Sequence, residues 1–263
     1  MLVIGELING MFKNVQEAIE KKDKAAIQGL ARKQIEQGAD MLDVNTGPYV
    51  KFPKDIMKWL VDSIQEVTDK TLVLDSTKSD VIEEGLKIVK SRAMINSTNA
   101  DDEKLNSIIP LVKKYNTMLI GLTMDKKGIP RDRNARLEHA AKIITTCESA
   151  GIDIKDIYID PIILPVNVAQ QQAIEVLESI RELKAICDPP PKTVVGLSNI
   201  SQGTNKRSII NTCFLVMAMA NGLSAAILDP LDKQLMDFAI TADLLLNKNI
   251  YCDSFLDAYR KRK

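Results

Sequence analysis

The chain has 263 residues, of which 45% are hydrophobic, and this composition can bury one large core. Basic and acidic residues number 35 each, so no net charge attracts a polyanion and we expect no nucleic-acid partner. No basic leader and no apolar run of about 18 residues is present, which predicts a cytoplasmic protein with no membrane association. We expect the basic run 260–263 to be a solvated tail.

Cysteine spacing gives no sign of a metal or cluster site. The four cysteines form no C-x-x-C pair, so we expect no bound metal and predict reduced, mostly buried thiols at Cys147, Cys187, Cys213 and Cys252.

Short β-type segments alternate with longer amphipathic segments along the chain. This alternation is typical of parallel strands joined by crossover helices, and each short segment is apolar nearly throughout, as in a strand covered on both faces. We predict eight strands, over 2–8, 41–45, 71–75, 93–96, 118–123, 157–160, 193–198 and 225–229.

Helical periodicity fills the intervals. In 101–115, for example, Leu105, Ile108 and Val112 recur at helical spacing. The other predicted helices cover 14–37, 54–68, 79–90, 132–150, 168–186, 206–220 and 231–246. Eight strand–helix units in about 250 residues predict a single-domain (β/α)8 TIM barrel over residues 1–263. An open dinucleotide-binding sheet is disfavoured because no G-x-G-x-x-G follows a strand.

Polar side chains collect where the apolar strands end. In a barrel these positions share the C-terminal face, where active sites form. Each residue alone has a structural alternative, because Asn, Asp and Ser also cap helices and make turns. The set comprises Glu6, Asn9, Asp43, Asn45, Asp75, Ser76, Asn96, Thr123, Asp160, Ser198, Asn199 and Asp229.

The residue types at this face exclude several reaction classes. His139, the only histidine, lies in a predicted helix, so a histidine base or a zinc ligand set is disfavoured. Neither G-x-S-x-G nor a P-loop motif is present. The remaining carboxylates and amides suit a neutral heterocycle with adjacent donors and acceptors, such as a reduced pterin.

Six segments resemble the pterin-binding methyltransferases, and within them the 5-methyltetrahydrofolate:corrinoid/iron–sulfur protein methyltransferases. The segments are 2–11 (LVIGELINGM), 43–48 (DVNTGP), 74–77 (LDST), 93–99 (AMINSTN), 158–167 (YIDPIILPVN) and 196–202 (GLSNISQ). The resemblance implies transfer of the N5-methyl group of 5-methyltetrahydrofolate to the Co(I) centre of a corrinoid on a separate corrinoid/iron–sulfur protein. It places this reaction in the one-carbon branch of anaerobic acetyl-CoA metabolism. It also implies a homodimer, with folate as substrate and no tightly bound cofactor in this chain.

The resemblance also assigns roles to individual residues. It implies that Asp75, Asn96 and Asp160 hold the pterin ring, that Gln202 lies beside the folate, and that Asp43, Asn45 and Ser198 belong to the binding site. Asn199 is the catalytic candidate, since the resemblance places it near N5, where its amide can favour the protonated or transition-state form. Arg207 is implied to reach the benzoyl-glutamate arm, with a surface cation as the alternative. The proton on N5 is expected to arrive through water and a carboxylate such as Asp160 or Asp75.

No D-x-H-x-x-G corrinoid motif is present, so we expect a borrowed corrinoid whose carrier docks on loops 49–54, 98–101 and 203–206. Three alternatives stay open: a tetrahydrofolate methyltransferase of an O-demethylase system, a dihydropteroate synthase, and a non-catalytic folate-binding protein. The synthase is disfavoured because the positions matching its cationic pyrophosphate site read Asn45-Thr46-Gly47-Pro48 and Leu228-Asp229-Pro230.

Overall fold

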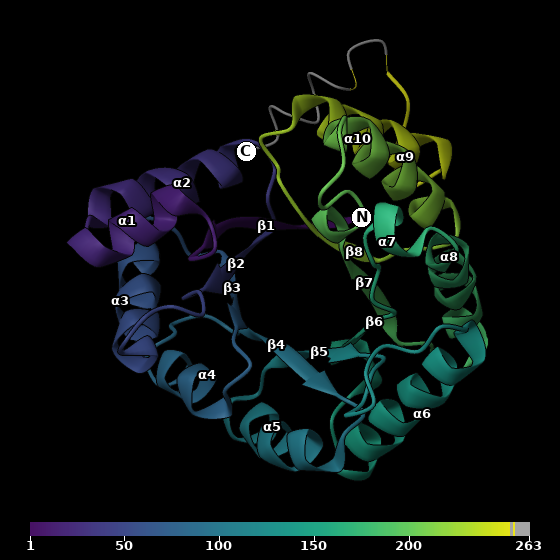
Figure 1. Cartoon of the computed structure of the whole chain (residues 1–263), viewed down its shortest axis with the longest axis horizontal. Helices are drawn as coiled ribbons and strands as arrows, with labels where there is room; N and C mark the ends of the chain where they lie inside the picture. Colours follow the sequence, from purple (N-terminus) through teal and green to yellow (C-terminus); the bar gives the residue numbers. More distant parts are fainter. Residues whose placement is uncertain (253–254, 256–263) are drawn as a thin grey trace.

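Eight parallel strands close into a barrel in the order of the sequence, with helices around the outside (Figure 1). The computed structural model describes residues 1–252 and 255, so the basic run 260–263 lies outside the described residues. The predicted single-domain TIM barrel is confirmed. In the described part of the chain, no helix combines the length and the apolar character that crossing a membrane requires.

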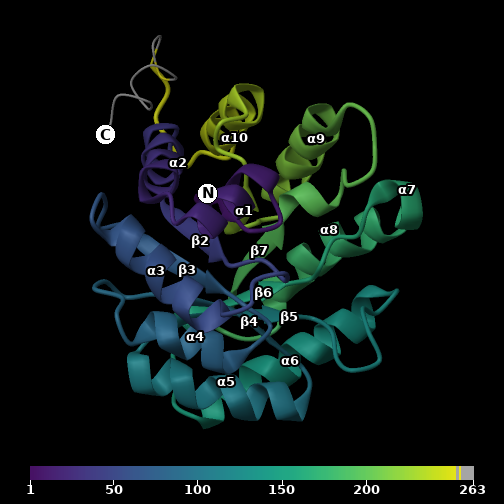
Figure 2. The same ribbon diagram turned by 60° about the vertical axis from the view of Figure 1, so that its left-hand side comes forward.

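The strands are β1 (Leu2–Asn9), β2 (Met41–Asn45), β3 (Thr71–Asp75), β4 (Met94–Asn99), β5 (Met118–Leu122), β6 (Ile157–Asp160), β7 (Lys192–Gly196) and β8 (Ala225–Leu228). The α-helices are α1 (Lys13–Lys21), α2 (Lys24–Glu36), α3 (Pro53–Gln65), α4 (Ser79–Leu86), α5 (Asp102–Tyr115), α6 (Arg133–Ser149), α7 (Val166–Ala169), α8 (Gln172–Glu182), α9 (Arg207–Ala220) and α10 (Lys233–Leu245). Three 3-10 turns are η1 (Ile154–Asp156), η2 (Leu183–Ala185) and η3 (Leu197–Asn199). Figure 2 shows α7 and α8 beside α9 on one side of the barrel.

Two predicted helices are divided in the structure. The predicted helix 14–37 breaks at Lys22, whose left-handed φ of 53° ends α1. Asp23 then caps α2, because its side chain accepts a hydrogen bond from the Ala26 amide. The predicted helix 168–186 similarly separates into α7, α8 and η2.

Two predicted strand ends differ from the structure by two or more residues, and both lie beside the site. β7 ends at Gly196, so Ser198 and Asn199 lie in η3 rather than in a strand. β4 continues to Asn99 through a register shift between Asn96 and Thr98. The bulge lets the strand extend beyond Asn96, where its apolar run ends.

An apolar layer, with one side chain from every strand, fills the barrel interior on the N-terminal side of the polar strand ends. The layer consists of Ile4, Met41, Val73, Met94, Ile120, Tyr158, Val194 and Ala225. A larger core surrounds it, between the outer face of the strands and the helices. The interior is therefore packed rather than open, and a ligand can bind only on the C-terminal side of this layer.

The loops after β1 and β2 touch through their backbones. The Gly10 amide donates to the Asn45 carbonyl at 2.9 Å, and a Cβ on Gly10 would lie 2.2 Å from the Thr46 carbonyl oxygen. Gly47 has a φ of 78°, a conformation that favours glycine. Two glycines of the quoted segments 2–11 and 43–48 thus allow these loops to pack at the barrel opening.

The prediction of mostly buried thiols is wrong. All four cysteines are free, but Cys147 alone is buried, Cys187 is partly exposed, and Cys213 and Cys252 are exposed. Cys213 lies on the outer side of α9 with exposed Ile209 and Met217, so apolar character did not indicate burial there.

Candidate active site

The next inward-facing residue on each strand forms a second layer, which we call the mouth layer. Side chains on a strand alternate between faces, so the residue two positions beyond each member of the apolar layer also points inward. Applied to the apolar layer, this rule gives Glu6, Asp43, Asp75, Asn96, Leu122, Asp160, Gly196 and Ile227. Five of these eight residues are carboxyls or amides, so the C-terminal opening of the barrel is polar directly above an apolar floor.

Two hydrogen bonds join strands at this opening, one between the neighbours β2 and β3 and one between β2 and β4, on either side of β3. Asn96 donates through Nδ2 to Asp43 Oδ1 at 3.1 Å, and Asn45 donates through Nδ2 to Asp75 Oδ2 at 2.5 Å. Asn45 Oδ1 also accepts from the Gly47 amide at 2.7 Å. Asn45, predicted to bind substrate, therefore bridges the loop and Asp75, while the amide oxygen of Asn96 is available to a ligand.

Burial raises the pKa of both carboxyls in this network. The pKa of Asp43 lies well above its ordinary value because the group is desolvated and Asp75 is nearby. Burial raises the pKa of Asp75 to about 6, while the Asn45 hydrogen bond opposes that rise. Burial and the nearby Asp75 therefore favour the protonated form of Asp43, whereas Asp75 can accept hydrogen bonds from ligand N–H groups as a carboxylate at neutral pH.

Asp160 faces this pair from β6. It is buried, its Oδ1 accepts from the Ile162 amide at 2.7 Å, and burial raises its pKa to about 7. The fully buried Arg136 fixes the same segment, since its Nε donates to the Pro161 carbonyl at 2.8 Å. Backbone amides of Ile162 and Gly196 thus hold the Asp160 carboxyl, and its remaining lone pairs can bind a ligand.

Glu6 was noted at a strand end but not assigned to the site, although the two-residue period from Ile4 identifies it. Its Oε1 accepts from the Ser198 hydroxyl at 2.6 Å. Because β8 lies between β1 and β7, this bond passes over the end of β8 and crosses the barrel opening. Burial raises the pKa of Glu6 to about 7, against the effect of the Ser198 hydrogen bond.

The remaining predicted residues lie at the rim. Asn199, in η3, and Gln202 are both exposed. Arg207 is the first residue of α9 and bends back, with Nε donating to Ser201 Oγ at 3.0 Å and Nη2 donating to the Ser198 carbonyl at 3.1 Å. Arg207 thus braces the turn that carries Ser198 and Asn199.

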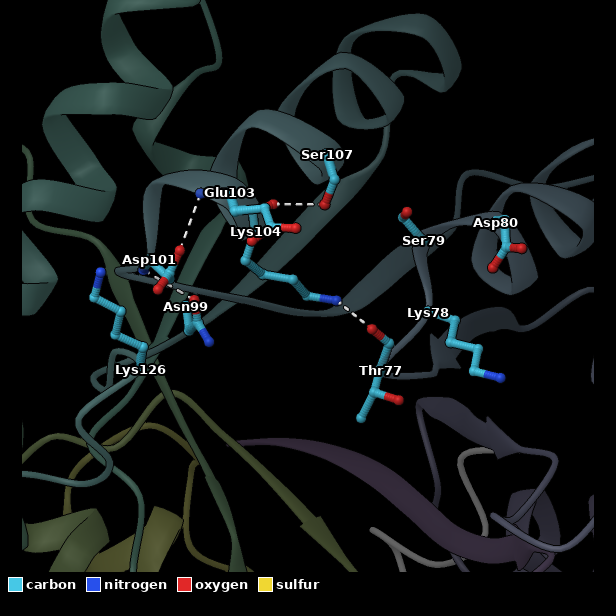
Figure 3. Close-up of a pocket in the computed structure, with 10 residues that line it drawn as sticks. All are labelled: Thr77, Lys78, Ser79, Asp80, Asn99, Asp101, Glu103, Lys104, Ser107 and Lys126. Atoms are coloured by element: carbon cyan, nitrogen blue, oxygen red, sulfur yellow. Dashed lines mark hydrogen bonds between the residues drawn. The ribbon is translucent and has the colours of Figure 1, made fainter.

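A solvent-open pocket of about 550 Å³ adjoins the β3 and β4 side of the mouth (Figure 3). Lys104 extends into it and donates to the Thr77 carbonyl at 2.8 Å, and partial burial lowers the pKa of Lys104. Cations and carboxylates are mixed along its wall, which is lined by Thr77, Lys78, Ser79, Asp80, Asn99, Asp101, Glu103, Lys104, Ser107 and Lys126. This pocket had no signal in the strand-end pattern, because most of its wall comes from loops and from α4 and α5.

The three predicted docking loops differ in exposure. Tyr49 and Phe52 are 78% and 68% exposed, and the loop 203–206 is exposed except for the partly buried Thr204. Thr98 and Ala100, in contrast, are buried, and β4 includes the first two residues of 98–101, so the prediction that this segment forms a docking loop is wrong.

Comparisons with known proteins identify the family of this chain. Residues 11–229 match the family described as pterin binding enzyme. A methylcorrinoid:tetrahydrofolate methyltransferase of Eubacterium limosum is 28% identical, with 100% of this chain and 97% of that protein covered.

Methionine synthases of Mycobacterium tuberculosis and Mycobacterium leprae are each 31% identical over 86% of this chain, which spans only 20% of their length. Among solved structures, a Coxiella burnetii dihydropteroate synthase in complex with pteroic acid has the same fold, with a TM-score of 0.66 and 18% identity over 94% of each chain. Since the family match covers most of the chain, this protein is an enzyme that belongs to the pterin binding enzyme family.

Proposed function

We propose that this enzyme transfers a methyl group between N5 of tetrahydrofolate and the cobalt of a corrinoid held by a separate protein. The observation that carries the proposal is the mouth layer, in which Asp75, Asn96 and Asp160 face one space from three strands. The full-length similarity to a methylcorrinoid:tetrahydrofolate methyltransferase supports the reaction class.

The free atoms of the mouth layer match the edge of a reduced pterin. The ring donates hydrogen bonds through its 2-amino and N–H groups, and Asp75 and Asp160 each keep carboxyl lone pairs able to accept them. The amide oxygen of Asn96 can accept one more, because its Nδ2 is bonded to Asp43. The apolar layer beneath closes the site and strengthens these hydrogen bonds by excluding water.

Asn199 completes the proposed site at the solvent side. A methyl acceptor as large as a corrinoid protein must approach from solvent, and Asn199 is exposed on a turn above the mouth layer. Its amide would accept a hydrogen bond from protonated N5 or stabilise the charge that develops there. Gln202 and Arg207, on the same side, are proposed to contact the outer part of the folate.

The direction of methyl transfer depends on which corrinoid protein the enzyme serves. We propose transfer from 5-methyltetrahydrofolate to the Co(I) centre of a corrinoid/iron–sulfur protein in anaerobic acetyl-CoA metabolism. The name of the Eubacterium limosum relative describes the methylcorrinoid as donor, which favours a second candidate, delivery of methyl groups to tetrahydrofolate in a demethylating system. Both directions share one transition state, so one site can serve either. A cytoplasmic location and a homodimer stay predictions.

Dihydropteroate synthesis is a weaker candidate. Similarity to the solved synthase, at 18% identity, concerns the fold. A pyrophosphate leaving group needs cations beside it. At the ends of β2 and β8 this chain has Asn45 and Asp229, whose side chains provide no positive charge.

Mixing the enzyme with 5-methyltetrahydrofolate and chemically reduced cobalamin tests the proposal. The account predicts loss of the Co(I) absorption and growth of the methyl-Co(III) absorption at a rate proportional to enzyme concentration. Tight folate binding without that conversion, in either direction and with either free or protein-bound corrinoid, would identify a binding protein instead.

A further inference from the structure

The proposed methyl transfer, on which this inference rests, requires a proton at N5. A tertiary amine leaves poorly unless its nitrogen carries positive charge, so a group at the barrel mouth must exchange a proton with N5. The one histidine, His139, lies in α6 on the outside of the barrel. The mouth layer contains carboxyls but no lysine, cysteine or tyrosine, so a donor within it is a carboxyl or a water molecule.

The carboxyls at the mouth differ in what holds them. Asp43 and Asp75 accept from side-chain amides, and Asp160 and Asp229 accept from the backbone amides of residues two positions further on. An amide N–H does not pass on a proton at neutral pH. A hydroxyl can, because it donates and accepts at the same oxygen. Among the described mouth residues, Glu6 alone is bonded to a hydroxyl, that of Ser198.

The position of this pair also fits a relay. Glu6 is on β1 and Ser198 is on the turn after β7, so their hydrogen bond spans the opening above β8. Ser198 directly precedes Asn199, the exposed residue of η3, and Arg207 holds the Ser198 carbonyl. The hydroxyl thus lies between a buried carboxyl and the exposed turn.

We propose that Glu6, acting through the Ser198 hydroxyl, is the group that exchanges the N5 proton. In transfer from folate, the Glu6 carboxyl gives its proton to the hydroxyl oxygen, and the hydroxyl proton passes to N5. The N5–CH3 bond then breaks, its electron pair stays on N5, and the Co(I) electron pair forms the Co–CH3 bond. The products are neutral tetrahydrofolate with N5–H and a Glu6 carboxylate, which regains a proton from solvent. The reverse transfer returns the proton to Glu6.

The charges around Glu6 suit a group that works in both directions. Asp43 on β2 and Asp229 after β8 favour its neutral form, while Arg207 on α9 favours the carboxylate. Burial is the largest influence, and together these effects bring the pKa of Glu6 to about 7. Both forms of the carboxyl are therefore populated near neutrality, as a proton exchanger requires.

The test compares Glu6→Gln with the wild type in single-turnover methyl transfer to free cobalamin across pH, with tetrahydrofolate affinity measured by calorimetry. Glutamine keeps an acceptor for Ser198 but carries no exchangeable acid. We expect affinity to change by less than about 3-fold and the rate to fall by roughly 100-fold, within the range for general acid catalysis. Wild-type transfer from folate should slow as pH rises through the Glu6 pKa, and E6Q should lack this step.

The matched control is Glu83→Gln on α4, whose carboxyl also accepts from a hydroxyl, that of Tyr115, but outside the mouth. It should keep the wild-type rate and pH profile. Glu6→Asp should restore part of the rate, and Ser198→Ala should lower it with folding verified by circular dichroism. A wild-type pH profile in E6Q, or equal losses of rate and affinity, would overturn the relay. Absence of transfer by the wild type itself would instead refute the proposed function.

Discussion

At the residue scale, the site depends on buried carboxyls without direct counter-charges. In the described part of the chain, neither Asp43 nor Asp75 forms an ion pair, and both are neutralised in part by raised pKa values and amide hydrogen bonds. An unpaired buried carboxylate is costly to maintain. Ligand N–H groups directed at Asp75 and Asp160 would remove that cost. The burial of unpaired carboxylates therefore destabilises the empty site and, by the same amount of free energy, favours ligand binding.

Replacing Asp75 or Asp160 by Asn should weaken tetrahydrofolate binding. Each change removes an acceptor for ligand donors in a desolvated site, at a cost of about 1–3 kcal/mol, or roughly 5- to 150-fold in affinity. Calorimetry measures the effect, and Asp62→Asn on the exposed side of α3 is the control. Unchanged affinity in both mouth variants would mean that these carboxyls have only a structural role.

Asn199→Ala should lower the rate of methyl transfer more than it weakens folate binding. An interaction that strengthens as charge develops on N5 acts mainly in the transition state, and loss of one such partner costs on the order of 100-fold in rate. Single-turnover kinetics and calorimetry on the same preparation separate the two effects. Equal losses would leave Asn199 as an ordinary ligand contact.

At the scale of elements, the turn after β7 connects the binding residues to the solvent side. A Cβ on Gly196 would lie 3.0 Å from Asn199 Nδ2, and Arg207 anchors the turn from the start of α9. Strand periodicity predicted a strand through Ser198, two residues too far. It could not reveal the turn, because the bonds that form η3 and attach Arg207 to it come from tertiary contacts.

Local sequence patterns predict the residues at the strand ends, but they do not predict contacts between residues far apart in the chain. The apolar strands and their two-residue period were sufficient to place Asp43, Asp75, Asn96 and Asp160 at one opening. The hydrogen bond between Glu6 and Ser198 joins residues 192 positions apart and depends on barrel closure, so no local pattern contains it.

A bulky residue in the loop after η3 should impair transfer to a corrinoid protein more than transfer to free cobalamin. Asn205 is exposed and suits the test, whereas Gly203 has a φ of 73°, so its substitution would strain the backbone. For Asn205→Trp we expect at least a 5-fold difference between the two acceptors in stopped-flow assays. Equal effects on both acceptors would argue against docking at this loop.

At the scale of the whole molecule, the closed barrel determines both site and stability. β8 pairs with β1, and the amino group of Met1 forms a buried ion pair with Asp243 of α10 at 2.5 Å. Closure brings eight strand ends to one opening, and the carboxyls gathered there are desolvated together. Protonation of these carboxyls therefore affects both the free energy of unfolding and the affinity for a ligand.

The free energy of unfolding of the ligand-free enzyme should fall between about pH 5 and about pH 7. Glu6, Asp75 and Asp160 have native pKa values raised to about 7, 6 and 7, so the native state binds more protons than the unfolded chain in this window. Their unfavourable contribution is absent at low pH and complete above about pH 7. Urea denaturation across this range measures the slope, and E6Q should flatten it. Stability that rises with pH here would show that these carboxyls are not desolvated.

Tracing the methyl carbon tests the central claim most directly. The enzyme is incubated with 5-methyltetrahydrofolate labelled with ¹³C in the methyl group and with reduced corrinoid, and the label is followed by NMR. The account predicts that the label moves from N5 to cobalt, returns to N5 when unlabelled tetrahydrofolate is added in excess, and moves far more slowly with Asn199→Ala. Label that stays on the folate with every corrinoid acceptor, while the enzyme binds the folate fully, would contradict the account.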